Sequence, residues 1–555
     1  MDFRRYFLWG ALFITGYLLF LQWNHDYGPQ SKQSAAQTTQ QTAETIKQSE
    51  SETDLPDAHH NANTNTDSSK IPDNVTKVAP GKLIHVQTDT LSVDINPVGG
   101  DIVGAALPKY TKVLGKPAPF VILEDTPAHV YVTQSGLIGP DGPDASPKGR
   151  PVYTTEKTSY TLEKGQDALN VNLYYTGPNG VKYTKTFRFT KGNYRIKEMM
   201  TIDNTTDKVW RGNLFSQIKR DNSPDPSQST NMGLHPYLGG AISDNDTKYS
   251  KVSFEKMKDE PVKVTADKGW VALLQHYFVT AWVPEQGQNF TLQARTNGDF
   301  NLIGFVGPQV VVEPGKKDTL SSTFYVGPKL EKHLEATAPN LDLTVDYGWL
   351  WFLAKPIFSL LSFIHSVVGN WGFSIILIVC CVKLVFFKLS AASYRSMAKM
   401  RKFAPEIAKL KEQYGDDRQK MSQAMMALYK KEKINPLGGC LPILVQMPVF
   451  LSLYWVLMES VQLRHAPFIF WIHDLSVMDP YFILPILMGL SMFGQQMLNP
   501  TPPDPMQAKI MKLMPIAFTF FFLWFPAGLV LYWVTNNSLS ILQQYIITKR
   551  IEREG

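Results

Sequence analysis

The 555-residue chain has only 3 cysteines, and all of them lie inside apolar runs, at Cys380, Cys381 and Cys440. A disulfide framework of the kind that staples small secreted domains is therefore excluded. The motifs G-x-x-x-x-G-K-[ST], H-E-x-x-H and C-x-x-C are absent from the sequence as well. Because these motifs carry nucleotide, zinc and redox chemistry, we expect no enzyme activity, no cofactor and no metal site.

Long apolar runs are missing from residues 28–340, whereas residues 345–548 hold almost all of them. A chain of this length is too long for one hydrophobic core, so it divides into a water-soluble domain and a membrane domain. Positive charge is also uneven, because residues 391–435 carry 11 Lys and Arg against 5 Asp and Glu. This basic segment sets the expected topology, since basic loops stay on the cytoplasmic side.

The first three segments are predicted from composition and periodicity. Residues 1–27, with Arg4 and Arg5 before an apolar run of spanning length, favour an uncleaved signal anchor over a cleaved signal peptide. Residues 28–80 are too polar to order and form a disordered linker. Residues 81–340 alternate with period two between frequent turn signals, which predicts an antiparallel β-sandwich. His235 and His276 are isolated there and read as ordinary surface or core histidines.

The remaining segments form a membrane domain with six spans in the whole chain. Residues 341–390 hold an interfacial amphipathic helix at 349–366 and a second span at 371–389. If both segments crossed the membrane, the basic loop after them would lie on the same side as the β-sandwich, against the positive-inside rule. Residues 436–548 hold spans three to six, at 437–458, 481–498, 512–526 and 529–547, with a turn at 526–528. Residues 549–555 form a tail, and both termini are cytoplasmic.

The basic segment, residues 391–435, predicts a cytoplasmic helical hairpin. Its apolar positions follow helical spacing at Met400, Phe403, Ile407, Tyr414, Met425 and Tyr429. These side chains either join the two helices to each other or contact the ribosome, a substrate or lipid headgroups. The sequence leaves both interpretations open.

Polar residues recur within the expected spans, and Lys383 in "IVCCVKLVFF" is the most costly of them. The others are Gln446, Ser491, Gln495, Trp533, Asn536, Ser540 and Gln543. Lys383 could extend its side chain to the near interface, but Lys388 already occupies that level. A charge inside a span costs about 2.5 to 3.5 kcal/mol, which favours a functional lysine facing water or a substrate. For any single polar residue, a hydrogen bond that joins two helices is an equally good explanation.

Three membrane segments carry a family resemblance: "NPLGGCLPILVQMPVFLSLYWVL" (435–457), "WIHDLSVMDPYFILPILMG" (471–489) and "FFLWFPAGLVLYWVTNNSLSILQQ" (521–544). They resemble the YidC-type membrane protein insertases, and "DYGWLWFLAKPIFSLL" (346–361) resembles the Gram-negative members. The resemblance implies a polytopic α-helical membrane protein with a five-helix core and a large periplasmic β-supersandwich. It also implies a bacterial inner-membrane location, with residues 28–370 periplasmic.

The resemblance further implies a hydrophilic groove open to the cytoplasm and to lipid, through which nascent inner-membrane proteins are inserted and helped to fold, alone or with the secretion translocase. Lys383 stands where the family has a groove arginine, and Met447, Phe450 and Phe521 match positions that face substrates. Implied partners are nascent membrane proteins, secretion translocase subunits, ribosome and signal-recognition components, and membrane lipids, without specific nucleic-acid recognition. A transporter, a lipid flippase or an assembly factor working through the β domain remain alternatives.

Overall fold

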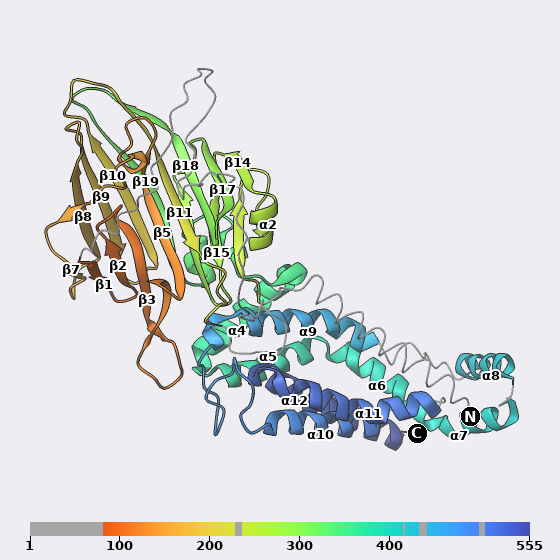
Figure 1. The fold of residues 1–555 in the computed structure, drawn as a ribbon. Coiled ribbons are helices and arrows are strands. Elements are labelled where there is room, and N and C mark those ends of the chain that lie inside the picture. The colour runs from red at the N-terminus through yellow and green to blue at the C-terminus, as the bar shows by residue number, and fades with distance from the viewer. Residues whose placement is uncertain (1–81, 228–235, 415–416, 432–440, 499–504, 555) are drawn as a thin grey trace, which may run out of the picture. The chain divides into compact units, whose positions relative to one another are not determined.

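A computed structural model describes residues 82–227, 236–414, 417–431, 441–498 and 505–554. The predicted signal anchor, the predicted linker and His235 lie outside these ranges. The strands that follow run from Ile84 to Pro328 and form the β domain, and helices from Trp351 to Glu554 form the helical domain. Figure 1 shows both, with many of their elements labelled.

The first sheet of the β domain has ten strands in the order β14-β17-β18-β11-β5-β4-β3-β2-β1-β7. Neighbouring strands are antiparallel except β1 and β7, which pair in parallel. The strands are β1 (Ile84–Gln87), β2 (Ser92–Asn96), β3 (Asp101–Thr111), β4 (Pro119–Thr126), β5 (His129–Ile138), β7 (Ser159–Thr161), β11 (Trp210–Arg220), β14 (Val262–Ala266), β17 (Phe290–Asn297) and β18 (Phe300–Val312).

The second sheet has nine strands in the order β13-β12-β15-β16-β19-β10-β9-β8-β6. They are β6 (Thr154–Thr155), β8 (Ala168–Thr176), β9 (Lys182–Thr190), β10 (Arg195–Asp203), β12 (Gly239–Ser243), β13 (Ser250–Val252), β15 (Trp270–Leu274), β16 (Phe278–Pro284) and β19 (Lys317–Pro328). Two short helices, α2 (Phe254–Asp259) and α3 (Glu331–Glu335), accompany the sheets.

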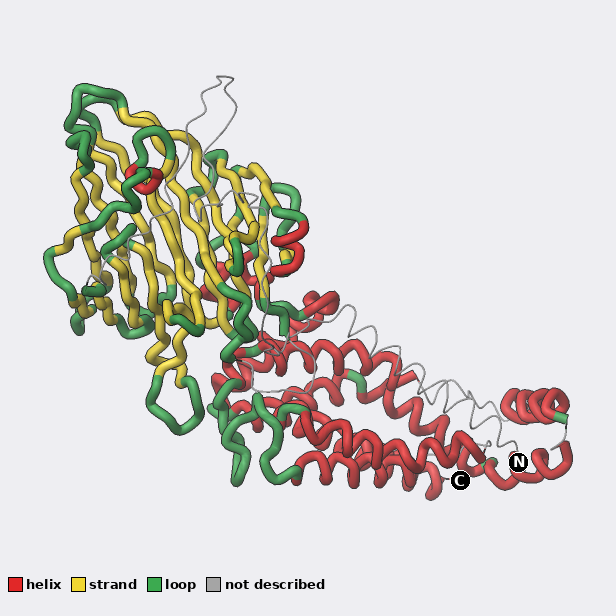
Figure 2. The backbone as a smooth tube through the Cα atoms, in the orientation of Figure 1, coloured by secondary structure: helices red, strands yellow, loops and turns green. Residues whose placement is uncertain are grey.

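The two sheets pack face to face because each buries alternate residues of its strands. In β9 the inward residues are buried and those between them are partly or fully exposed. Hydrogen bonds join the sheets across the core: Tyr131 on β5 lies 2.7 Å from Thr280 on β16, and Trp282 donates to Thr133 at 2.6 Å. Figure 2 shows the strands in these layers. The prediction of a β-rich domain followed by a helical region is confirmed.

The helical domain consists of nine α-helices in the part of the chain that the structure describes. They are α4 (Trp351–Val368), α5 (Trp371–Val385), α6 (Phe387–Lys402), α7 (Ala404–Tyr414), α8 (Arg418–Lys431), α9 (Leu441–Glu459), α10 (Ile483–Leu498), α11 (Pro505–Phe521) and α12 (Ala527–Glu554). Helix α12 contacts α5, α6, α9 and α10, so it lies at the centre of the packing, and α7 packs on α8.

The described helices do not confirm six spans. One helix, Gly348–Val368, is long and apolar enough to cross a membrane, and a second candidate is the pair Trp371–Val385 and Phe387–Met397, which bends by 70°. Val445–Glu459 and Ile483–Leu498 are shorter apolar helices. The segment expected to lie in the interface is thus the one that meets the length and hydropathy criteria, because its Leu, Ile, Val and Phe residues outweigh Lys355 and His365.

The helices of the structure differ in detail from two of the predicted segments. The single helix expected over 371–389 breaks at Phe386, whose backbone N–H caps the end of α5 while α6 starts at Phe387. The turn expected at 526–528 comes earlier, since the chain bends at 522–526 and Ala527 already begins α12. A backbone bridge between Met478 and Pro526 holds this turn in place, a long-range contact that local sequence does not reveal.

Candidate functional site

Lys383 lies on α5 and is directed at α12. Its side chain is 8% exposed, and Nζ donates a hydrogen bond of 2.7 Å to Oγ of Ser540. Ser540 Oγ in turn donates to the backbone carbonyl of Asn536, also at 2.7 Å. Among the described residues, no carboxylate lies within ion-pair distance of Lys383. Among the described residues, the buried amino group of Lys383 therefore has a hydroxyl group as its partner and no carboxylate.

The residues of the polar face predicted on α12 make different kinds of contact. Ser540 contacts Lys383, and Gln543 donates from Nε2 to the backbone oxygen of Phe387 at 3.4 Å, next to the break between α5 and α6. Trp533 packs in an aromatic cluster instead, with its ring centroid 4.4 Å from that of Phe450 on α9. Sequence periodicity could not separate the residue that binds Lys383 from the one that belongs to aromatic packing.

A second polar contact joins α12 to α10. Asn537 donates from Nδ2 to Oγ of Ser491 at 3.1 Å, and Gln544 donates to the backbone oxygen of Leu498, also at 3.1 Å. Sequence reasoning included Ser491 but missed Asn537 and Gln544. Their spacing of seven residues, two helical turns, is the signal that could have found them. Gln446 and Gln495 are half-buried, and neither reaches Lys383 through a hydrogen bond within the described ranges.

The three residues expected along a substrate path differ in exposure. Met447 is 49% exposed on α9 and Phe521 is 57% exposed at the end of α11. Phe450 is half-buried, because its ring contacts those of Tyr532 and Trp533 on α12. Met447 and Phe521 therefore present apolar surface, whereas Phe450 belongs largely to the packing between α9 and α12.

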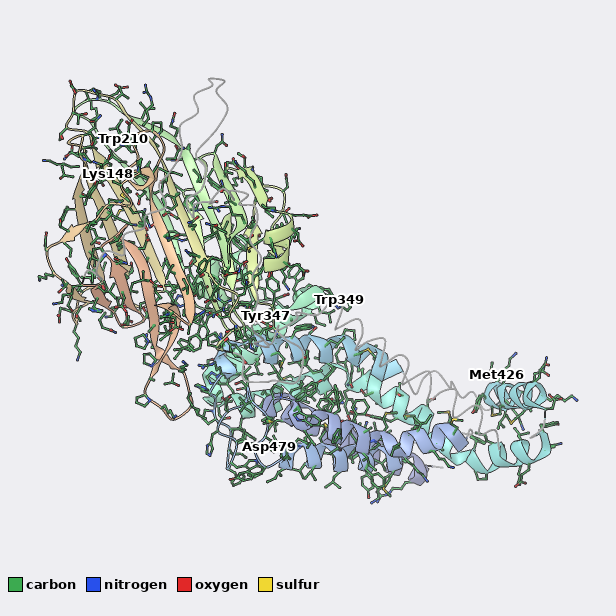
Figure 3. The ribbon with its side chains drawn as sticks, viewed as in Figure 1. Lys148, Trp210, Tyr347, Trp349, Met426 and Asp479 are labelled. Carbon is green, nitrogen blue, oxygen red and sulfur yellow. The ribbon has the colours of Figure 1, made fainter. Side chains whose placement is uncertain are left out.

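The predicted hairpin residues lie on α6, α7 and α8 or at their junctions. All six are half-buried: Met400, Phe403, Ile407, Tyr414, Met425 and Tyr429. Met426 on α8 is instead 64% exposed, and Figure 3 shows it on that helix. The apolar stripes thus pack partly against protein, while Met426 presents an apolar side chain that the sequence analysis did not single out.

The loop between α9 and α10 is organised by buried carboxylates. Asp479, labelled in Figure 3, is 1% exposed and accepts hydrogen bonds from Trp471 Nε1 at 3.0 Å and from the backbone N–H of Leu484 at 2.7 Å. Asp474 accepts from the backbone N–H groups of His465 and Ser476. These carboxylates replace missing backbone partners in an irregular segment. No group of residues suited to hold a metal ion occurs in the described ranges.

Comparisons with known proteins cover the whole chain. The family model of the YidC periplasmic domain matches residues 83–360, and that of the 60Kd inner membrane protein matches residues 363–554. Membrane protein insertase YidC of a Marinomonas species is 75% identical over 555 residues, covering 100% of both chains. The protein of the same name from Pseudomonas fluorescens is 54% identical over 560 residues, covering 100% of this chain and 99% of the relative.

A solved structure described as an active YidC insertase matches 84% of this chain and 93% of that chain at 17% identity, with a TM-score of 0.37, which is too low to support an argument. The sequence matches stand without it, because both family models and full-length relatives agree over the β domain and the helical domain. The chain belongs to the YidC family of inner-membrane proteins, the membrane protein insertases.

Proposed function

We propose that this insertase receives the polar flank of a nascent membrane segment at Lys383 and releases the apolar part sideways into lipid. The observation that carries the proposal is the buried lysine, 8% exposed, whose Nζ hydrogen-bonds to the hydroxyl of Ser540 and has no carboxylate partner among the described residues. A buried charge without a counter-ion is costly, so a substrate flank that brings a carboxylate or water recovers part of that cost.

The driving force in this proposal is partition of the apolar segment into the bilayer. Transfer of apolar surface out of water contributes about 25 cal/mol per Å², so a segment of spanning length needs no nucleotide hydrolysis to insert. The exposed side chains of Met447 and Phe521 supply apolar surface along which such a segment could move. Gln495 and Asn536 would replace part of the hydration of the polar flank on its way to Lys383.

The finer topology belongs to the same proposal. We infer six spans, both termini in the cytoplasm, residues 28–370 in the periplasm, and the division of the chain into the seven segments predicted above. The α7–α8 hairpin would then face the cytoplasm, where its lysines and the exposed Met426 suit contact with a nascent chain or the ribosome. The secretion translocase and signal-recognition components are the further partners proposed.

Complementation in a strain depleted of its own insertase tests the role of the charge. Lys383→Ala should fail to support growth, whereas Lys383→Arg, which keeps a cation, should succeed. The matched control is Lys388→Ala, because Lys388 is an exposed lysine at the start of α6, whereas Lys383 is buried. Full growth with Lys383→Ala at normal protein level would overturn the proposal.

Crosslinking gives an independent test. A photoreactive amino acid at position 383 should react with the polar flank of a stalled nascent membrane protein, and the same probe at position 388 should react much less. If the probe at position 383 reacts only with lipid or with neighbouring helices, the nascent chain does not pass this site.

A further inference from the structure

The loop that joins β3 to β4 is an exposed, basic and apolar tip. Residues 112–119 are all exposed, and Val113 and Leu114 are 47% and 43% exposed. Backbone hydrogen bonds from Lys112 to Ala118 and from Lys116 to Val113 close the loop. Figure 1 shows β3 and β4 reaching beyond the ends of their neighbours in the sheet. An ordered turn thus presents an apolar pair that no part of the β domain covers.

The charged residues within this tip are all basic. Lys109, Lys112 and Lys116 lie within the segment 109–118, which contains no Asp or Glu. Lys109 has a carboxylate partner, Asp89, at 3.5 Å, whereas Lys112 and Lys116 flank the apolar pair directly. An apolar tip between two lysines matches the composition of a bilayer surface, where anionic headgroups lie above the acyl chains.

Specific contacts attach the tip to the loop between α9 and α10. Arg464 donates from Nη1 to the backbone oxygen of Thr111 at 2.9 Å and from Nη2 to that of Lys112 at 3.2 Å. Oγ1 of Thr111 lies 3.1 Å from Nδ1 of His465. The guanidinium of Arg464 also lies over the ring of Phe120 on β4, 5.2 Å from its centroid. These contacts hold the base of the hairpin against the α9–α10 loop.

The α9–α10 loop lies at one end of the helices. Asn370, between α4 and α5, donates to the backbone oxygen of Pro467 at 3.3 Å, and the backbone N–H of Ala527, which begins α12, donates to Val477 at 2.7 Å. The turns of three helix pairs therefore meet there. In a membrane protein, the ends of the helices mark the level of the headgroups.

The same loop exposes aromatic side chains. Phe470 is 80% exposed and Tyr481 is 66% exposed, and Phe470 adopts the left-handed backbone conformation with φ of 53°. The buried carboxylate of Asp479 fixes this segment through Trp471 Nε1. Aromatic rings at helix ends are typical of the membrane interface, where a ring sits between water and acyl chains.

We propose that the β3–β4 tip and the aromatic α9–α10 loop form one lipid-binding surface, which contacts anionic phospholipid headgroups of the leaflet on the β-domain side. A protein partner is the less favoured occupant, because Val113 and Leu114 sit on a narrow turn between lysines and form no extended apolar face. The surface would keep the β domain at a fixed height above the bilayer.

Depth measurement on the full-length protein in lipid nanodiscs tests this proposal, with Cys380, Cys381 and Cys440 replaced by alanine. An environment-sensitive fluorophore on Leu114→Cys should be quenched by headgroup-labelled nitroxide lipid at least about twofold more than one on Lys316→Cys. Lys316 is the matched control, because it is exposed in the β18–β19 hairpin turn at the other end of β19 from Lys329. The difference should be present in discs containing phosphatidylglycerol and much smaller in discs of phosphatidylcholine alone.

The variant Lys112→Gln/Lys116→Gln separates charge from simple proximity. Each basic residue near an anionic surface strengthens binding by about fivefold, so the double variant should lower quenching at position 114 toward the control level. Three results would overturn the proposal: equal quenching at positions 114 and 316, quenching indifferent to phosphatidylglycerol and to both lysines, or burial of the fluorophore only when another protein is added. Unchanged unfolding midpoints would show that the variants are folded.

Discussion

His276 should make the β domain less stable in mild acid. The side chain is 6% exposed, its ring stacks on Tyr277 with centroids 3.7 Å apart, and Nε2 lies 2.9 Å from the backbone oxygen of Met458 on α9. Burial, together with the positive charges of Lys329 and Arg464, lowers the pKa of His276 to about 3, although the Met458 carbonyl opposes the shift. The folded protein therefore keeps this ring neutral at pH values where the unfolded chain protonates it.

The size of the effect follows from linkage. A histidine in the unfolded chain has a pKa of about 6.5, so below that pH the unfolded state binds a proton that the folded state does not. The free energy of unfolding then falls as the pH drops from about 6.5 toward 3, by about 1.4 kcal/mol at pH 5.5 and by almost nothing at pH 7.5. For a domain of this size, that loss lowers the unfolding midpoint by about 3 to 6 °C.

Thermal unfolding of the detergent-solubilised full-length protein checks this prediction, followed by the fluorescence of Trp210, Trp270 and Trp282, which are fully buried in the β domain. His276→Gln should remove about 3 to 6 °C of the difference in midpoint between pH 7.5 and pH 5.5. His473→Gln is the control, because His473 is an exposed histidine outside the β domain. Equal pH shifts in the wild type and in His276→Gln would refute the assignment of the acid sensitivity to this ring.

Two further predictions concern buried charges. Lys329, after β19, and Glu459, at the end of α9, have side chains 3% and 8% exposed, with Nζ and Oε2 3.8 Å apart. Lys329→Met or Glu459→Leu alone should lower the free energy of unfolding by about 3 to 5 kcal/mol, because each leaves the other charge buried without a partner, whereas Lys329→Met/Glu459→Leu together should lower it much less. Additive losses in a double-mutant cycle would contradict this coupling. Asp479→Ala should lower the free energy of unfolding by about 1 to 2 kcal/mol. It should also speed amide hydrogen exchange at Tyr481 and Leu484, because their N–H groups donate to this carboxylate. Unchanged exchange at these two residues would exclude that role.

The β domain could be predicted because its sequence follows period two closely. β9 and β10 alternate buried and more exposed residues along their whole length, so the local pattern alone was enough to predict the fold class. The order of the strands could not be predicted in the same way, because the pairing of β5 with β11 joins residues about 80 positions apart. Such pairings depend on the packing of both sheets, so a short stretch of sequence does not predict them.

The helical domain was less predictable, since apolar runs identify helices but not where they bend. Nothing in the sequence around Phe386 is a helix breaker, as neither Pro nor Gly occurs between 373 and 404. The break is stabilised from a distance, by the Gln543 side chain that reaches the Phe387 carbonyl. The sequence singled out Lys383 as a costly charge in an apolar run, but it could not distinguish Ser540 from the other polar residues on α12 as its hydrogen-bond partner.

One face of α12 contacts both the buried Lys383 and the break between α5 and α6. Ser540 and Gln543 are three residues apart, so the helix presents both side chains toward the α5–α6 segment. One solvates Lys383 Nζ and the other binds the carbonyl exposed by the bend. Lysine presents three donors from a single point, unlike the planar fork of arginine, and Ser540 accepts one of them. Within the described ranges Lys383 makes no second hydrogen bond, and under the role proposed above its other two donors would bind water or the polar flank of a substrate.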